Sequence, residues 1–218
     1  LIMSTGSVIE GRNKITPTRN IENLPSSIWK VKDWSDCNIR AERYTQVPIA
    51  GSLPVINKTI ELIRPDFEIN SDVLILDDGA NEIADLIWFQ QSTKQVHFIH
   101  CKASHGENPG RRKADCDILF TQAMRSIHWV SSVSLIDRLK ERVQGNSELI
   151  LTNQATWESL ADNFKINNWS YNIILPQPGF DIEKVSDRDR NNNNVYELAI
   201  PMYERILGSI AELEIWGS

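Results

Sequence analysis

The 218-residue chain lacks features that would place it in several large protein classes. Its three cysteines, Cys37, Cys101 and Cys116, form an odd and widely spread set that does not fit a disulfide framework. No apolar run approaches the roughly 18 residues that a membrane helix needs. The first residues also lack the basic and apolar regions of a secretory signal. We therefore expect a cytoplasmic protein with no membrane partner.

The chain also has little positive charge. Its 23 Lys and Arg residues are outnumbered by 29 Asp and Glu residues, which gives a net charge of −6. Proteins that bind nucleic acid tightly on their own usually present a basic surface, and this balance disfavours such a role. It still permits an enzyme with a local basic patch, or a domain whose binding is supplied by a larger assembly. No G-x-x-x-x-G-K-[ST] motif occurs, so we expect no ATP site.

Apolar periodicity and turn residues predict an α/β fold. Residues 1–27 are polar and interrupted by Gly, Pro and Asn, which predicts a flexible N-terminal arm or linker, with the folded domain at 28–218. Ser52 is a candidate cap for the first helix. A polar low-complexity loop is expected at 187–194. The predicted helices span 52–64, 115–130, 133–143, 157–164 and 195–207, and the predicted strands span 73–76, 83–89, 96–101, 148–152, 170–175 and 211–216.

The first three strands are predicted to form an antiparallel meander, because short polar loops of hairpin length join them. Their continuous apolar character indicates that both faces are covered. The order of elements is then helix, three strands, helix and strand. This order predicts a mixed central sheet flanked by helices, followed by a C-terminal α/β extension.

Three carboxylates accompany the first two of these strands. Asp85 interrupts an apolar strand, Glu82 stands at the edge of that strand, and Asp78 lies in the preceding turn. A buried unpaired carboxylate is costly, so Asp85 indicates either a metal ligand or a structural salt bridge, for which Lys102 is a candidate partner. Asp78 is also an ordinary turn residue, and Glu82 an ordinary solvated charge. Carboxylates are the ligands that Mg²⁺ prefers.

Two further polar residues end the third strand. By strand alternation, His100 and Lys102 share one face, and Asp85 can face them across the hairpin. Cys101 and His97 then point to the opposite face. A lysine beside a metal-bound water can orient that water and stabilise developing negative charge. A histidine in this position is also often a satisfied core residue.

This spacing resembles the PD-(D/E)xK nuclease signature, an Asp on one strand and an acid-x-Lys on the next. Asp85 matches the first acid and Lys102 matches the lysine, but His100 stands where the family has Glu or Asp. Imidazole binds Mn²⁺ and other transition metals well and Mg²⁺ poorly. Glu82 or Asp78 could supply the missing carboxylate. The resemblance implies a restriction-endonuclease-like core and a Mg²⁺ or Mn²⁺ cofactor.

The resemblance extends to two helices. Glu61 corresponds loosely to an acid that many members carry on the helix before the sheet. Gln122 lies where members related to RecB carry a glutamine on the helix after the sheet. A glutamine in this place is also a common surface or core hydrogen-bonding residue.

A longer set of blocks covers roughly residues 30 to 218. The strings DDGANEIADLIWF, HFIHCKAS, PGRRKADCDILFTQAMRSIHW and LPQPGF resemble a domain found in bacterial DEAD/DEAH-type helicases of phage-defence and restriction islands. This resemblance implies DNA as a partner. It also implies a helicase or ATPase region, or another defence subunit, in cis or in trans.

The segment before the second predicted helix holds three consecutive cations, Arg111, Arg112 and Lys113. Their place near the candidate site makes them, with Ser104, candidates for nucleic-acid contacts. The alternative is a solvated loop. A zinc site built from His100, Cys101, His105 and Cys116 is disfavoured, because there is no C-x-x-C pair and His100 and Cys101 point to opposite faces. Nothing marks either thiol as an activated nucleophile.

The sequence therefore predicts a metal-dependent DNA endonuclease or nickase of a bacterial defence system. Asp85, Glu82 and Asp78 are the expected metal ligands. The expected catalytic residues are Asp85, Lys102, His100, Glu82 and Gln122. The competing hypothesis is a nuclease-like module without catalytic activity that binds DNA or docks a partner.

Overall fold

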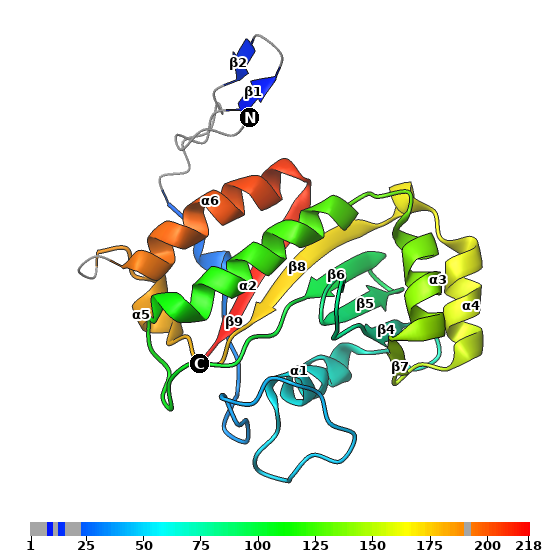
Figure 1. Cartoon of the computed structure of the whole chain (residues 1–218), viewed down its shortest axis with the longest axis horizontal. Helices are drawn as coiled ribbons and strands as arrows, with labels where there is room; N and C mark the ends of the chain where they lie inside the picture. Colours follow the sequence, from blue (N-terminus) through cyan, green and yellow to red (C-terminus); the bar gives the residue numbers. More distant parts are fainter. Residues whose placement is uncertain (1–7, 11–12, 16–22, 190–192) are drawn as a thin grey trace.

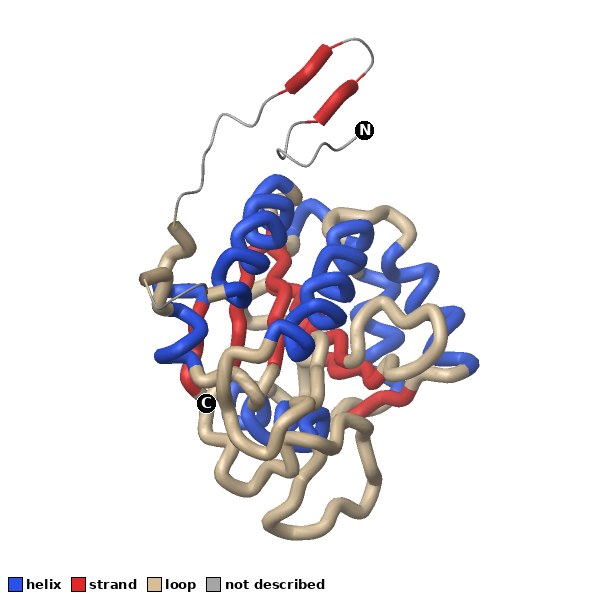
Figure 2. The backbone as a smooth tube through the Cα atoms, turned by 60° about the vertical axis from the view of Figure 1, so that its left-hand side comes forward, coloured by secondary structure: helices blue, strands red, loops and turns tan. Residues whose placement is uncertain are grey.

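A computed structural model describes residues 8–10, 13–15, 23–189 and 193–218. Its centre is a mixed seven-stranded sheet with helices on both faces (Figures 1 and 2). The strand order is β3-β9-β8-β6-β5-β4-β7. No helix within these residues is long and apolar enough to cross a membrane. The strands are β3 (Trp29–Val31), β4 (Val73–Leu76), β5 (Leu86–Gln90), β6 (Gln95–Ile99), β7 (Glu148–Ile150), β8 (Ser170–Pro176) and β9 (Ala211–Gly217).

The middle of the sheet is the predicted antiparallel meander of β4, β5 and β6. Strand β8 lies parallel to β6, and β9 and β3 continue in parallel, whereas β7 pairs antiparallel with the far side of β4. The α/β class and the mixed sheet are thus as the sequence predicts. Several predicted strand boundaries were wrong: β5 begins at Leu86 rather than Ile83, β6 ends at Ile99 rather than Cys101, and β7 ends at Ile150 rather than Thr152.

The helices form two layers. Helix α1 (Val55–Ile63) covers one face, and α2 (Lys113–Ser126) and α6 (Asn194–Gly208) lie side by side across β8 and β9 on the other (Figure 1). Helices α3 (Leu135–Gly145) and α4 (Gln154–Asn163) flank the β4 end, and a short α5 (Ile182–Ser186) precedes α6. Single 3-10 turns are η1 (Ser26–Ile28), η2 (Arg64–Asp66), η3 (Ile127–Trp129) and η4 (Ile166–Asn168).

The predicted start of the first helix was also wrong. Pro54, not Ser52, is the N-cap of α1, and no side chain caps it. The reason is that the backbone before Pro54 is already engaged: Ser52 N donates to Ile49 O at 3.0 Å, and Leu53 N donates to Asp36 O at 2.9 Å. Asp115 lies in the first turn of α2 and does not cap it; the N-cap there is Arg112.

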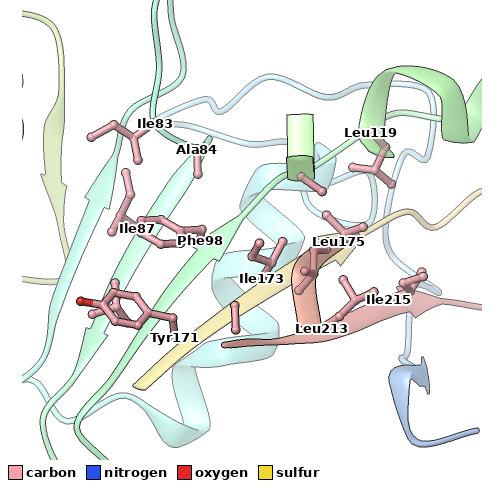
Figure 3. Packing of buried hydrophobic residues seen from close by; sticks show 14 of the residues in the cluster. Ile83, Ala84, Ile87, Phe98, Leu119, Tyr171, Ile173, Leu175, Leu213 and Ile215 are labelled. Atoms are coloured by element: carbon pink, nitrogen blue, oxygen red, sulfur yellow. The ribbon is translucent and has the colours of Figure 1, made fainter. Parts of the chain in front are cut away.

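Two apolar cores lie on opposite faces of the sheet, which confirms that the meander is covered on both sides. Ile87 and Phe98 belong to the core beneath α2 and α6, with Leu119, Ile173 and Leu213 around them (Figure 3). The alternate residues of β5 and β6 face α1. This second core includes Leu86, Trp88, Ile99, Val55 and Ile60. The meander is therefore held by packing on both faces, and the polar residues at the ends of its strands are held in fixed positions.

The helix, strand and helix predicted at 133–143, 148–152 and 157–164 are present between α2 and β8 as α3, β7 and α4. The N-terminal arm predicted at 1–27 lies partly outside the described residues. Within it, β1 (Val8–Glu10) and β2 (Asn13–Ile15) form an antiparallel hairpin. Leu24 is already buried in the core, and its N–H donates to Tyr196 Oη at 2.8 Å.

The polar loop predicted at 187–194 includes residues 190–192, which are not described. Its last part is ordered by Asn193, which is buried. The side-chain carbonyl oxygen of Asn193, Oδ1, accepts the N–H of Tyr196 at 3.2 Å. Its side-chain nitrogen, Nδ2, donates to the backbone carbonyls of Lys184, Val185 and Asp187. Asn193 is therefore the N-cap of α6 and joins that helix to α5.

Candidate metal centre

Asp78, Glu82 and Asp85 come together at the turn from β4 to β5. One ligand oxygen from each lies within 4.8 Å of the others, and no other such group of His, Cys, Asp or Glu occurs in the described part of the chain. The three side chains run from the surface inward: Asp78 is exposed, Glu82 is half-buried and Asp85 is buried. The turn itself is closed by Glu82, whose N–H donates to Gly79 O and whose carboxylate accepts the Gly79 N–H, both at 3.1 Å.

Asp77 is adjacent to Asp78 but is bound by other groups of the fold and is not part of the carboxylate group. Its carboxylate accepts the Ile83 N–H at 2.8 Å and hydrogen bonds from Arg142 Nε and Ser147 Oγ. Both Asp77 and Arg142 are buried, so this is a compensated ion pair within the fold. It fixes the β4–β5 turn to α3 and holds the three carboxylates in place.

Asp85 is a buried acid among other acids. Its Oδ2 accepts the Cys101 N–H at 2.7 Å. This hydrogen bond lies just past Ile99, the last residue of β6 that pairs with β5. Burial, and then the charge of Glu82, raise the pKa of Asp85 well above its ordinary value. Burial also raises the pKa of Asp78. A divalent cation would offset this repulsion, and an all-carboxylate set of oxygens is the donor set that Mg²⁺ and Mn²⁺ accept.

Lys102 does not pair with Asp85, so that alternative is not formed. Its Nζ instead lies 2.7 Å and 2.9 Å from the two carboxylate oxygens of Glu42, one of which also accepts the Ala103 N–H at 2.9 Å. The positive charge of Lys102 still acts on the cluster, because it is one of the charges that lower the pKa of Asp78. Lys102 is therefore bound by Glu42 while its charge acts on Asp78.

Glu42 is a residue that the sequence analysis missed. It lies in the loop between β3 and α1, about 60 residues before its partner, and no local pattern marks it. The acid expected on α1, Glu61, is exposed and lies 3.8 Å from Lys58. The additional acid near the centre thus comes from the loop before the helix and not from the helix.

His100 and Gln122 reach the cluster from its inner side. His100 is 2% exposed, with Nε2 2.6 Å from Ser126 Oγ and Nδ1 3.9 Å from Asp85 Oδ2. Burial, and then the charge of Arg125, lower the pKa of His100 to about 3, so the ring is neutral. Gln122 Nε2 donates to Glu82 at 3.2 Å, while its Oε1 is buried and has no hydrogen-bond partner among the described residues.

Strand alternation explains only part of this arrangement. Cys101 does face the other side, where its Sγ donates to Thr59 Oγ1 at 3.5 Å, and His97 stacks on Trp88 there with 4.5 Å between ring centroids. Lys102, however, lies three residues beyond the end of β6. Its side chain turns to the loop before α1, whereas that of His100 contacts α2.

The thiols are not candidate nucleophiles. Burial raises the pKa of Cys101 well above its ordinary value and raises the pKa of Cys116 to about 12.

The four expected nucleic-acid contacts divide into two pairs. Ser104 is buried and donates to Asp115 Oδ2 at 3.2 Å, and Arg112 Nη2 donates to Ser104 Oγ at 3.0 Å. Both are thus part of a network around Asp115 that holds the loop before α2. Arg111 and Lys113 are exposed at the start of that helix. Because they are exposed, Arg111 and Lys113 are more accessible to a large ligand than Ser104 and Arg112.

No protein-family model, curated protein or solved structure matches the chain. The chemistry of the centre is therefore inferred from its own geometry.

Proposed function

We propose that this protein hydrolyses phosphodiester bonds of DNA with a divalent cation, Mg²⁺ or Mn²⁺, as an endonuclease or nickase. The observation that carries the proposal is the approach of Asp78, Glu82 and Asp85 to within 4.8 Å of one another. Lys102 adds a positive charge that acts on Asp78. Three carboxylates in a partly buried position repel one another unless a cation neutralises them. A lysine beside such a cation is suited to the chemistry of phosphate esters.

Each residue has a defined role in this proposal. Asp85, Glu82 and Asp78 hold the cation, which when bound polarises the phosphoryl group and lowers the pKa of a water. Lys102 orients the attacking water and stabilises the negative charge that develops on the phosphate. Gln122 holds Glu82 in place through its hydrogen bond. His100 lines the inner wall beside Asp85.

The arrangement of the sheet supports a wider proposal. A helix, an antiparallel meander, a second helix and a strand parallel to the third is the order of a restriction-endonuclease-like core, and α1, β4–β6, α2 and β8 follow it. This order supports the proposal that the chain is related to PD-(D/E)xK nucleases and acts in cytoplasmic antiviral defence. Its proposed partners are DNA and a helicase or ATPase region, or another defence subunit, in cis or in trans. Exposed Arg111 and Lys113 are the proposed DNA contacts, and Arg112 and Ser104 support their loop.

A second candidate function is a nuclease-like module without catalysis that binds DNA or docks a partner. The observation in its favour is His100, which stands at the acid position, is neutral and is held by Ser126. The pairing of Lys102 with Glu42 and the net charge of −6 point the same way.

Cleavage of supercoiled plasmid DNA separates the two functions. With Mg²⁺ or Mn²⁺, we expect the wild-type protein to nick or linearise the plasmid. We expect Asp85→Ala and Lys102→Ala to lower the rate by about 100-fold or more, as is typical when charge stabilisation is removed. Glu61→Ala is the matched control, because Glu61 is exposed and away from the carboxylate group, and it should leave the rate unchanged.

Absence of cleavage by a folded wild-type protein would contradict the nuclease proposal, as would equal cleavage by all variants. Binding of labelled DNA without cleavage, insensitive to Asp85→Ala, is the result expected of the non-catalytic module. Circular dichroism of each variant establishes that it is folded.

A further inference from the structure

His100 has one ring nitrogen that the fold leaves without a partner. The side chain is 2% exposed, and its Nδ1 has no hydrogen bond within the described residues. A buried polar atom left unpaired is destabilising, so such atoms are rare in native proteins and call for an explanation. His100 lies at the inner edge of the candidate metal centre, which suggests where the explanation is found.

The hydrogen bonds around His100 determine its tautomer. Ser126 has one hydroxyl proton, which it donates to the carbonyl oxygen of Ile83 at 3.1 Å. The Ser126 oxygen must then accept from His100, so Nε2 carries the ring proton in the 2.6 Å contact between them. A neutral imidazole carries one ring proton, so with Nε2 as the donor Nδ1 has none. It presents a free lone pair.

That lone pair faces Asp85. His100 Nδ1 lies 3.9 Å from Asp85 Oδ2, too far for a hydrogen bond. Two atoms that each lie about 2.1 Å from one ion are about 3.0–4.2 Å apart for angles from 90° to 180°, and the observed separation falls in that range. Without a cation, the two atoms face each other with no hydrogen bond between them. A shared cation would satisfy both.

We propose that His100 Nδ1 is a nitrogen ligand of the cation that Asp85 holds, and that the centre therefore selects Mn²⁺ over Mg²⁺. This inference rests on the proposed metal-dependent function and narrows its cofactor. Imidazole nitrogen favours Mn²⁺, Co²⁺ and Zn²⁺, whereas Mg²⁺ prefers oxygen ligands alone. Ser126 acts as a positioning residue, because its hydrogen bond fixes the tautomer and the ring orientation that ligation requires.

The test is the spectroscopy of bound Mn²⁺, which needs no DNA. Pulsed electron paramagnetic resonance of Mn²⁺ on the full chain should show coupling to a histidine ¹⁴N, which changes to the ¹⁵N pattern when histidine is ¹⁵N-labelled. His100→Gln should abolish the coupling and lower the preference for Mn²⁺ over Mg²⁺ by about 10-fold or more in competition titrations. His105→Gln is the matched control, because the half-exposed His105 contacts Asp115 and not the carboxylate group, and it should retain both.

The outcomes distinguish this inference from the function on which it rests. Mn²⁺ that binds through Asp85 but shows no histidine coupling overturns the role of His100 and leaves the proposed nuclease intact. A coupling or a metal preference unchanged by His100→Gln also overturns it. If the wild-type protein binds no metal, or if Asp85→Ala does not weaken binding, both the inference and the proposed metal-dependent function fail. The isotope comparison uses the wild-type protein alone, so it decides the question even if His100→Gln does not fold.

Discussion

Two aspartates eight positions apart show how environment separates structure from function at the scale of single residues. Asp77 is buried with Arg142, Ser147 and a backbone N–H as partners, so its charge is compensated. Asp85 is equally buried, but it accepts one N–H from Cys101 and lies among other acids. A buried carboxylate whose charge is not compensated, such as Asp85, is typical of functional sites, because it does not stabilise the fold.

The stability of the protein should fall in mild acid because of His97. Burial lowers its pKa to about 4, so between about pH 6.5 and pH 4 the unfolded chain binds a proton that the folded chain does not. Stability is thus full above that window and is lost as the pH falls through it. His97→Gln should flatten the dependence by up to about 1.4 kcal/mol per pH unit in urea denaturation.

His128→Gln, at an exposed position in η3, is the control for the loss of a histidine as such. A wild-type stability that is constant from pH 6.5 to 4, or a slope that His97→Gln does not change, would contradict the burial argument for His97.

Single residues were predictable where they broke a local pattern. Asp85 could be singled out because a carboxylate within an apolar run has to be paired or functional. Glu42 could not be, because it occupies an ordinary polar loop and gains its significance from Lys102, a partner about 60 residues away. The orientation of His100 was not predictable either, because it depends on Ser126 in a helix that the strand pattern does not describe.

At the scale of elements, the loop that carries Arg111 is joined to the turn after β8. Gly110 N donates to Gly179 O at 2.8 Å, and Asp181 N donates back to Gly110 O at 3.0 Å. Gln177 extends the connection, because its Nε2 donates to the carbonyl of Asp115 at 3.2 Å. Two segments that stand far apart in the sequence, around PGRR and QPGF, therefore form one structural unit beside α2.

Gly179→Ala should disrupt this unit. A Cβ at Gly179 would lie 2.5 Å from Ser104 Oγ and 2.8 Å from Gln177 Oε1, and both atoms are held by buried hydrogen bonds. We expect a loss of about 1–3 kcal/mol in unfolding free energy, as for overpacking of a core. Gly208→Ala is the control, because nothing lies within 4 Å of its Cβ position in α6, and alanine in a helix is favoured.

Denaturation curves of the two glycine variants give the comparison directly. Equal stability of Gly179→Ala and Gly208→Ala would show that the contact between the two loops is not tight.

Most elements were predictable because their apolar periodicity is strong. Strand β4 was predicted with its observed bounds, since acidic turn residues follow it directly. The shift of β5 to Leu86 was not predictable, because Ile83 and Ala84 are as apolar as strand residues while their backbone follows the turn. Strand β7 was expected, but its position beside β4 was not. That position depends on pairing with a strand far away in the sequence and not on local sequence.

The molecule as a whole should be more stable with metal than without it, and Asp85 should account for the difference. Its raised pKa means that the folded state holds a proton at a pH where the unfolded state has lost it, so stability falls as the pH rises through that pKa. At neutral pH, Asp85→Asn should therefore raise the melting temperature of the metal-free protein by a few degrees, at about 2–4 °C per kcal/mol. Mn²⁺ should raise that of the wild-type protein and not that of Asp85→Asn.

Glu61→Gln, away from the carboxylate group, should match the wild-type protein in both conditions. Equal stabilisation of all three proteins by Mn²⁺ would show that the ion binds elsewhere.

The edge of the sheet at β3 has a consequence for the order in which the protein folds. The indole N–H of Trp34 donates to Gly217 O, a partner 183 residues away, whereas the β5–β6 hairpin joins residues such as Gln90 and His97 that are 7 apart. Closing the longer loop costs about 3 kcal/mol more in chain entropy. The meander that carries the acids can thus form early, and β3 joins β9 last. Native-state hydrogen exchange should accordingly find β3 the first strand to open and the β5–β6 pair among the last.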